Sequence, residues 1–172
     1  MILVAIGSNL PHPQHGSPQA VCAAAVKAIA EGRCTVTAQS RWFRSAAVPK
    51  SDQSDFTNGV ISVETAMAPT ELLIFLHRIE ARFARRRSEP NAARTLDLDL
   101  LAFGEIVNKG PVSPIVPHPR MINRAFVLLP MKDIAADWKH PVSGTSLADL
   151  IAALPPIRIA CPWRCRNSSQ AA

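Results

Sequence analysis

The sequence has 172 residues, 48% hydrophobic and 19% charged, and its 19 Lys and Arg outnumber 13 Asp and Glu to give a net charge of +6. That balance is typical of one globular domain and excludes a disordered or fibrous chain. No stretch predicts a secretory leader or a membrane-spanning helix, so we expect a cytoplasmic protein with no membrane partner. The positive charge favours an anionic partner, but charge alone does not distinguish nucleic acid, nucleotide and solvent ions.

The first half of the chain predicts a strand, a helix and a pair of strands, in that order. Residues 2–6 form an apolar run that ends at a Gly-Ser-Asn turn, as a buried strand does. Residues 19–31 are rich enough in alanine to form a helix. Residues 34–45 and 56–64 alternate apolar and polar positions, and the polar stretch 49–55 between them predicts a hairpin turn.

The second half predicts two more helices and an irregular tail. One helix begins at Pro69, and its core face is formed by residues at helical spacing: Leu72, Leu76, Ile79 and Phe83. Residues 146–149 resemble a capping box for a short helix that runs to Leu154. We expect residues 1–154 to form a single domain and residues 155–172 to form an irregular or disordered C-terminal tail.

The order of these elements predicts an α+β fold. The first strand, helix and strand resemble a βαβ unit, whereas the second and third strands resemble a hairpin. This mixture predicts a sandwich in which helices pack on a mostly antiparallel sheet.

The octet RTLDLDLL at residues 94–101 sets two carboxylates, Asp97 and Asp99, within a leucine run. Side chains alternate along a strand, so both aspartates share one face while the flanking leucines share the other. Aspartate is uncommon in strands, and two carboxylates ~6 Å apart repel by nearly 3 kcal/mol at an effective dielectric of about 20. A partly buried pair therefore needs a cation.

Magnesium is a cation that suits this spacing. The two side chains begin ~6 to 7 Å apart, and with metal–oxygen bonds of ~2.0 to 2.1 Å they could hold one Mg²⁺ jointly or bracket two. Mg²⁺ completes its coordination with water and substrate phosphates, which fits a site with few protein ligands. The alternative that the pattern leaves open is the solvated face of an edge strand.

A cluster of arginines before the aspartates favours a phosphate ligand. Five of them fall within thirteen residues: Arg82, Arg85, Arg86, Arg87 and Arg94. A triphosphate carries roughly −4, two Mg²⁺ cancel that charge and two aspartates restore about −2, so several arginines would bring the site near neutral. A solvated helix end is the alternative. The common nucleotide-binding signatures are absent from the sequence, so phosphoryl chemistry would use another scaffold.

Five segments together strongly resemble the hydroxymethyldihydropterin pyrophosphokinase family of folate biosynthesis. They are AIGSNL (5–10), DFTNGV (55–60), LHRIEARFARRR (76–87), RTLDLDLL (94–101) and VPHPRMINRAFVLLPMKDIA (116–135). They occur in that family's order and spacing, and the resemblance extends from residue 2 to about residue 154. It implies a ferredoxin-like fold and transfer of the terminal diphosphate of ATP to the hydroxymethyl group of 6-hydroxymethyl-7,8-dihydropterin, with release of AMP. We expect a monomer whose partners are these two small molecules and not nucleic acid.

The resemblance also implies a role for each matching residue. Asp97 and Asp99 match the ligands of two Mg²⁺ ions. The residues that match the pterin pocket are Ser45, Ala46, Val48, Phe56, Asn58 and Phe126. The residues that match ATP contacts are His77, Arg85, Arg87, Arg94, Leu100, His118 and Arg124. Arg85, Arg94 and the two aspartates are the expected catalytic residues.

The implied chemistry agrees with these residue types. Two phenylalanines suit stacking on a flat pterin ring, and the amide of Asn58 suits its polar edge. No side chain is obviously a strong base for the substrate hydroxyl, which phosphoryl transfer tolerates because positioning and charge stabilisation supply most of the effect. Our hypothesis is that one Mg²⁺ activates the hydroxymethyl oxygen for in-line attack on the β-phosphorus and the other stabilises the departing AMP.

Several of these residues have a simpler interpretation when taken singly. Phe56 and Phe126 could belong to the core, Asn58 to a turn and His118 to a loop between prolines. Glu80 matches a charged helix position near the site, but it could equally be a solvated carboxylate.

The chain also departs from the family pattern. Many members have Trp-Gly-Pro before the arginine, where this chain has Asn, Ala and Ala at 91–93. Many have glycine where it has Ala84, and a pair of prolines in the pterin wall where it has Ala46 and Ala47. These changes affect a closing loop of the kind that excludes water, and they leave the aspartate pair intact.

Two other classes of protein fit parts of the pattern. A binder of single-stranded nucleic acid would use Trp42, Phe56 and Phe126 as stacking platforms, but aromatic residues are only 5% of the chain and tyrosine is absent. A non-catalytic relative would bind pterin or nucleotide without turnover. Against it, both aspartates and the arginine before them are present.

Overall fold

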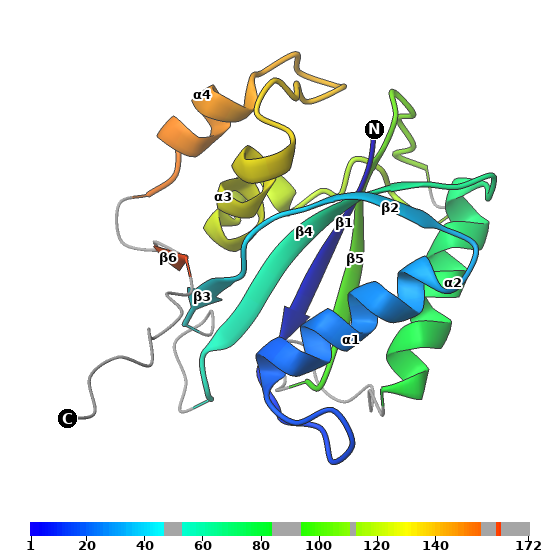
Figure 1. The fold of residues 1–172 in the computed structure, drawn as a ribbon. Coiled ribbons are helices and arrows are strands. Elements are labelled where there is room, and N and C mark those ends of the chain that lie inside the picture. The colour runs from blue at the N-terminus through cyan, green and yellow to red at the C-terminus, as the bar shows by residue number, and fades with distance from the viewer. Residues whose placement is uncertain (47–52, 84–93, 111–112, 156–160, 163–172) are drawn as a thin grey trace.

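A computed structural model gives the fold of the chain (Figure 1), and it describes residues 1–46, 53–83, 94–110, 113–155 and 161–162. The elements are β1 (Ile2–Ser8), α1 (Pro18–Ala30), β2 (Thr35–Gln39), β3 (Phe43–Ser45), β4 (Phe56–Glu64), α2 (Pro69–Arg82), β5 (Asp97–Phe103), a 3₁₀ turn η1 (Met121–Asn123), α3 (Ala125–Ile134), α4 (Leu147–Ala152) and β6 (Cys161–Pro162). Among the described residues, none of the helices has both the length and the apolar character that crossing a membrane requires.

The sheet has the strand order β5-β1-β4-β3-β6, with β2 also paired to β4, and all its pairs are antiparallel. Both β1 and β2 run antiparallel to β4, so they are parallel to each other with β4 between them. If β2 and β3 are counted as one interrupted strand, the chain order is βαββαβ, the ferredoxin-like arrangement. The predicted α+β fold with helices on a mostly antiparallel sheet is confirmed.

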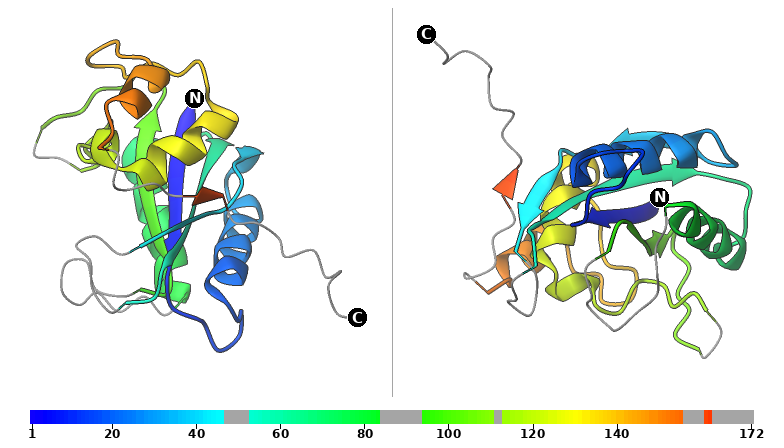
Figure 2. Two further views of the ribbon diagram at one scale, coloured as in Figure 1. Left: turned by 90° about the vertical axis from the view of Figure 1, so that its left-hand side faces the viewer. Right: turned by 90° about the horizontal axis from the view of Figure 1, so that it is seen from below.

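Two hydrophobic cores cover the two faces of the sheet. Helices α1 and α2 pack over one face, where buried residues such as Val4, Leu76 and Leu98 meet. Helices α3 and α4 pack over the other face, around Leu3 and Leu128. Figure 2 shows the sheet lying between these two helix pairs. Every central strand is therefore buried on both faces, except where polar side chains gather at the end of the sheet formed by the last residues of β1.

The helix starts follow local sequence signals. Ser17 caps α1 by accepting the Ala20 N–H at 3.3 Å, and a proline occupies the first turn, as it does in α2. In α4, Ser146 Oγ accepts the Asp149 N–H at 3.1 Å, which confirms the predicted cap. That helix ends at Ala152, two residues before the predicted end. Helix α3 was not predicted, because Pro130 lies inside it and proline usually ends a helix.

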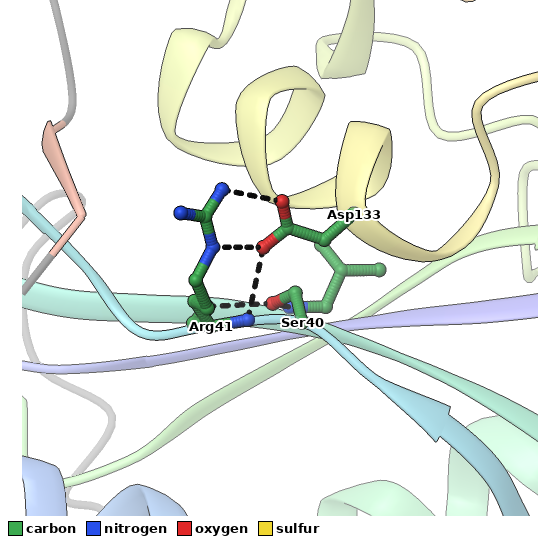
Figure 3. Close-up of polar contacts among 4 residues, drawn as sticks. Ser40, Arg41 and Asp133 are labelled. Atoms are coloured by element: carbon green, nitrogen blue, oxygen red, sulfur yellow. Dashed lines mark hydrogen bonds and ion pairs between the residues drawn. The ribbon is translucent and has the colours of Figure 1, made fainter.

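The predicted strand 34–45 is interrupted in the structure, which corrects the sequence analysis. The Ser40 N–H donates to the Val60 carbonyl at 2.9 Å, and the Ser40 Oγ accepts the Val60 N–H at 3.0 Å. The backbone N–H of Arg41 donates to Asp133 of α3 instead of to β4. The guanidinium of Arg41 donates two hydrogen bonds to the same carboxylate, with Nη2 2.7 Å from Oδ1 and Nε 3.0 Å from Oδ2 (Figure 3). This tertiary contact divides the segment into β2 and β3.

A short strand from the C-terminal tail lies beside β3. Cys161 pairs with Arg44 and Pro162 with Phe43. This pairing was not predicted from the sequence. Apart from Pro155 and these two residues, the predicted tail lies outside the described residues.

Candidate functional site

Asp97 and Asp99 lie on one face of β5, as the alternation predicted. Asp97 is paired with Gly7 of β1, and Asp99 with Ala5. Leu98 and Leu100 point to the opposite face and are buried in the core under α1 and α2. The aspartate side chains are half-buried, with 24% and 30% of their surface exposed. The alternative of a freely solvated strand face does not describe them.

Each carboxylate has its own arginine partner, and the two arginines come from different parts of the chain. Arg94 Nη1 lies 2.8 Å from Asp97 Oδ2, and Arg124 Nη1 lies 3.0 Å from Asp99 Oδ2. Arg124 immediately precedes α3, which packs on the same face of the sheet as the two aspartates, so the start of α3 brings this charge to Asp99. These two ion pairs offset the repulsion between the aspartates.

His118 completes the group around Asp99. Its Nε2 lies 3.9 Å from Asp99 Oδ2, and its backbone N–H donates to the Leu101 carbonyl at 2.8 Å. Burial lowers the pKa of His118, and Arg124 lowers it further, while Asp99 acts in the opposite direction. Since Nδ1 accepts the Arg120 N–H at 3.2 Å, the neutral ring carries its proton on Nε2, facing the carboxylate. His118 is therefore a neutral hydrogen-bond donor near pH 7.

Glu80 of α2 supports the strand between the two aspartates. It is only 1% exposed, and its Oε1 accepts the Leu98 N–H at 2.8 Å. The interpretation of Glu80 as a solvated carboxylate is therefore wrong. A sequence signal existed: Glu80 follows Leu76 by four residues and precedes Phe83 by three, so helical spacing puts it on the apolar face of α2.

A polar row runs across three strands next to Asp97. Asn58 of β4, Gly7 of β1 and Asp97 of β5 are adjacent in register. Asn58 is buried, and its Nδ2 donates to Ser45 Oγ at 2.9 Å. A Cβ on Gly7 would lie 3.3 Å from Asn58 Oδ1 and 3.9 Å from Asp97 Cβ. Glycine thus keeps the space between the amide and the carboxylate open.

The two phenylalanines expected to sandwich the pterin are both half-buried. Phe56 begins β4 and pairs with Ser45. Phe126 lies in the first turn of α3, with the Arg124 guanidinium carbon 5.5 Å from its ring centre. Neither ring is enclosed as a fully buried core residue is.

The remaining predicted residues are less informative. His77 is half-buried on α2, and Ala46 is exposed after β3. The Leu100 side chain is 3% exposed in the core under α1 and α2, so any contact with ATP would come from its main chain. The residues that lie outside the described part of the chain are Ala47, Val48, Ala84, Arg85, Arg86, Arg87 and residues 91–93.

Comparison with known proteins gives concordant matches. The model of the family described as 7,8-dihydro-6-hydroxymethylpterin-pyrophosphokinase matches residues 3–136. A 2-amino-4-hydroxy-6-hydroxymethyldihydropteridine pyrophosphokinase from Pseudomonas aeruginosa is 40% identical over 154 residues, which cover 90% of this chain and 91% of that protein. The enzyme of that name from Synechocystis is 41% identical over 112 residues, or 65% of this chain and 56% of that protein.

Solved structures share the fold at much lower identity. A crystal structure of Plasmodium falciparum HPPK-DHPS A437G/K540E with pterin and p-hydroxybenzoate superposes with a TM-score of 0.67 at 12% identity, covering 88% of this chain and 43% of that one. Another, of HPPK-DHPS in complex with substrates, gives a TM-score of 0.65 at 11% identity. At this low identity, both matches show only that the fold is shared.

Proposed function

Since the chain belongs to the 7,8-dihydro-6-hydroxymethylpterin-pyrophosphokinase family of folate biosynthesis, we propose that it transfers the terminal diphosphate of ATP to the hydroxymethyl group of 6-hydroxymethyl-7,8-dihydropterin and releases AMP. The observation that carries this proposal is the half-buried pair Asp97 and Asp99, each held by an arginine, beside the buried amide of Asn58. The pair is suited to a metal-bound triphosphate, and the amide is suited to a flat polar ring.

On the nucleotide side, Asp97 and Asp99 are the residues that would hold two Mg²⁺ ions. Carboxylate oxygens are the protein ligands that Mg²⁺ prefers, and one or two of them suffice when phosphates complete the shell. When bound, Mg²⁺ would neutralise triphosphate charge and polarise the phosphoryl groups. Arg94 and Arg124 already lie on these carboxylates, 2.8 and 3.0 Å away. Their guanidinium groups would turn from the aspartates to phosphate oxygens once the carboxylates bind Mg²⁺.

His118 assists as a donor. Because burial lowers its pKa, the ring is neutral at physiological pH and would offer its Nε2 proton to a phosphate oxygen. A neutral donor adds a hydrogen bond without adding a third positive charge beside the two arginines. Phosphoryl transfer depends on such fixed donors more than on a strong base.

On the pterin side, Asn58 and Ser45 would form the polar end of the binding site. Asn58 donates to Ser45 Oγ, which fixes the amide plane. An amide offers both a donor and an acceptor, and a pterin edge carries ring nitrogens and an amino group that match them. Phe56 and Phe126 would provide the faces against which the ring stacks. A planar heteroaromatic substrate suits this combination.

The direct test is to incubate the protein with ATP, the dihydropterin and Mg²⁺ and to measure AMP. We expect AMP only when all three are present. Asp97→Ala and Asp99→Ala should each lower kcat by more than ~100-fold, because the lost charge stabilisation amounts to several kcal/mol of barrier. A wild-type protein that releases no AMP at any Mg²⁺ concentration would exclude the proposal.

Asp133→Ala is the matched control. Asp133 is also an aspartate paired with an arginine, but this ion pair joins α3 to the connection between β2 and β3 (Figure 3) and involves neither aspartate of β5. This variant should keep the turnover of the wild type. Full activity in Asp97→Ala or Asp99→Ala would contradict the metal role of that residue.

A further inference from the structure

Asn9 is a buried residue, directly after β1, to which the sequence analysis gave no role. It is 1% exposed. Its Oδ1 accepts the Arg94 N–H at 2.8 Å, and its own N–H donates to the Arg94 carbonyl at 3.2 Å. Two hydrogen bonds therefore hold the backbone of Arg94 on both sides of its Cα. The guanidinium of the same arginine holds Asp97.

The other end of the Asn9 amide reaches a second segment. Its Nδ2 donates to Gln53 Oε1 at 3.1 Å and to the Ser54 carbonyl at 3.2 Å. Ser54 lies two residues before Phe56, the first residue of β4, and four before Asn58. One side-chain amide thus contacts two segments. The first, residues 53–54, leads to the predicted pterin residues, and the second contains Arg94, which holds a predicted metal ligand.

We infer that Asn9 is a positioning residue that couples the pterin half of the site to the triphosphate half, an inference that rests on the function proposed above. Its carbonyl oxygen orders Arg94 and its NH₂ group orders residues 53–54. These two functions belong to different atoms of one amide, so they can be separated by substitution. A residue that only stabilised the fold would not affect the two substrates differently.

Asn9→Asp separates the two functions. The carboxylate has nearly the same shape and keeps an oxygen acceptor for the Arg94 N–H. It replaces the NH₂ donor with an oxygen that faces two acceptors, Gln53 Oε1 and the Ser54 carbonyl. The bond to the Ser54 carbonyl is then lost, and Gln53 keeps a contact only by turning its own NH₂ toward the new oxygen, so the link to residues 53–54 is broken at the backbone. Asn9→Ala removes both links. Thr65→Ala is the control, because Thr65 Oγ donates to the Arg33 carbonyl and accepts the Met67 N–H at the opposite end of β4.

Steady-state kinetics with each substrate varied in turn give the main test. We expect Asn9→Asp to raise KM for the pterin at least 10-fold and to change KM for ATP less than 3-fold. Asn9→Ala should raise both KM values and lower kcat at least 10-fold. Thr65→Ala should unfold at a similarly reduced temperature but keep wild-type kinetics. If both Asn9 variants match Thr65→Ala in kinetics, the residue is structural only and the inference is wrong.

Amide hydrogen exchange tests the link without turnover. Exchange at Arg94 should accelerate at least 10-fold in Asn9→Ala and stay near the wild-type rate in Asn9→Asp, whereas exchange of the segment around residue 54 should accelerate in both. If wild-type protein releases no AMP, the proposed function fails, and exchange alone then decides the role of Asn9. Unchanged exchange at Arg94 in Asn9→Ala would overturn the inference whatever the activity.

Discussion

Gly7→Ala tests the geometry of the site with a single methyl group. That group would enter the space between Asn58 and Asp97, 3.3 Å from the amide Oδ1 and 3.9 Å from the aspartate Cβ. The second distance is an ordinary van der Waals contact. The first is tight, so the Asn58 side chain must move by a few tenths of an ångström. The substitution therefore displaces Asn58, the proposed pterin contact, and barely affects Asp97, the proposed metal ligand.

The expected magnitudes differ for stability and activity. Alanine in a strand is more favourable than glycine by roughly 0.5–1 kcal/mol, which offsets the tight contact, so the free energy of unfolding should change by less than about 1 kcal/mol. A misplacement of ~1 Å can cost about 100-fold in rate. A shift of a few tenths then predicts a loss of roughly 3- to 10-fold in kcat/KM for the pterin, with KM for ATP unchanged.

Thermal unfolding and steady-state kinetics measure the two effects, and Gly59→Ala is the control. A Cβ on Gly59 would lie 2.6 Å from a ring atom of Trp42, which is a severe overlap. Overpacking of this kind typically costs 1–3 kcal/mol, so Gly59→Ala should destabilise the protein clearly. Gly7→Ala with wild-type kcat/KM for the pterin would refute the role of Asn58. A loss of stability equal to that of Gly59→Ala would refute the packing argument.

Three further outcomes are expected. The Asp133 pKa is lowered by its hydrogen bonds with Arg41, so this pair stabilises the protein fully above the ordinary pKa of Asp133. The difference in unfolding free energy between wild type and Asp133→Asn should therefore shrink as pH falls through the lowered pKa, and a difference that grows below pH 4 would contradict this sign. Glu80→Ala should lower stability by about 1–3 kcal/mol because it removes the acceptor of the buried Leu98 N–H, whereas Glu80→Gln, which retains an amide oxygen, should lose less in the same denaturant titration. Truncation after Pro156 should leave a folded, active protein that is less stable by about 1 kcal/mol or less, since among the described residues it removes only the short pairing of Cys161 and Pro162 with β3. Loss of the cooperative unfolding transition would disprove this.

Much of the fold was accessible from local patterns. The strand at 56–64 and the helix start at Pro69 appear where they were predicted, because alternation and helical spacing report directly on which side of an element is buried. The same alternation placed Asp97 and Asp99 on one polar face. The failures have an equally physical origin: β2 and β3 are separated by a contact with Asp133, ninety-two residues from Arg41 in sequence, and no local pattern encodes that contact.

The residues of the proposed site divide in the same way. Sequence periodicity and family resemblance determined the aspartate pair, the arginine before it and the amide of Asn58, because each belongs to a short segment with its own pattern. Only the tertiary structure decided that Arg124 neutralises Asp99, that Glu80 holds Leu98, and that Asn9 joins Arg94 to residues 53–54. These partners come from separate elements, so their pairing depends on how the helices and loops pack around the sheet and is not written in any one segment.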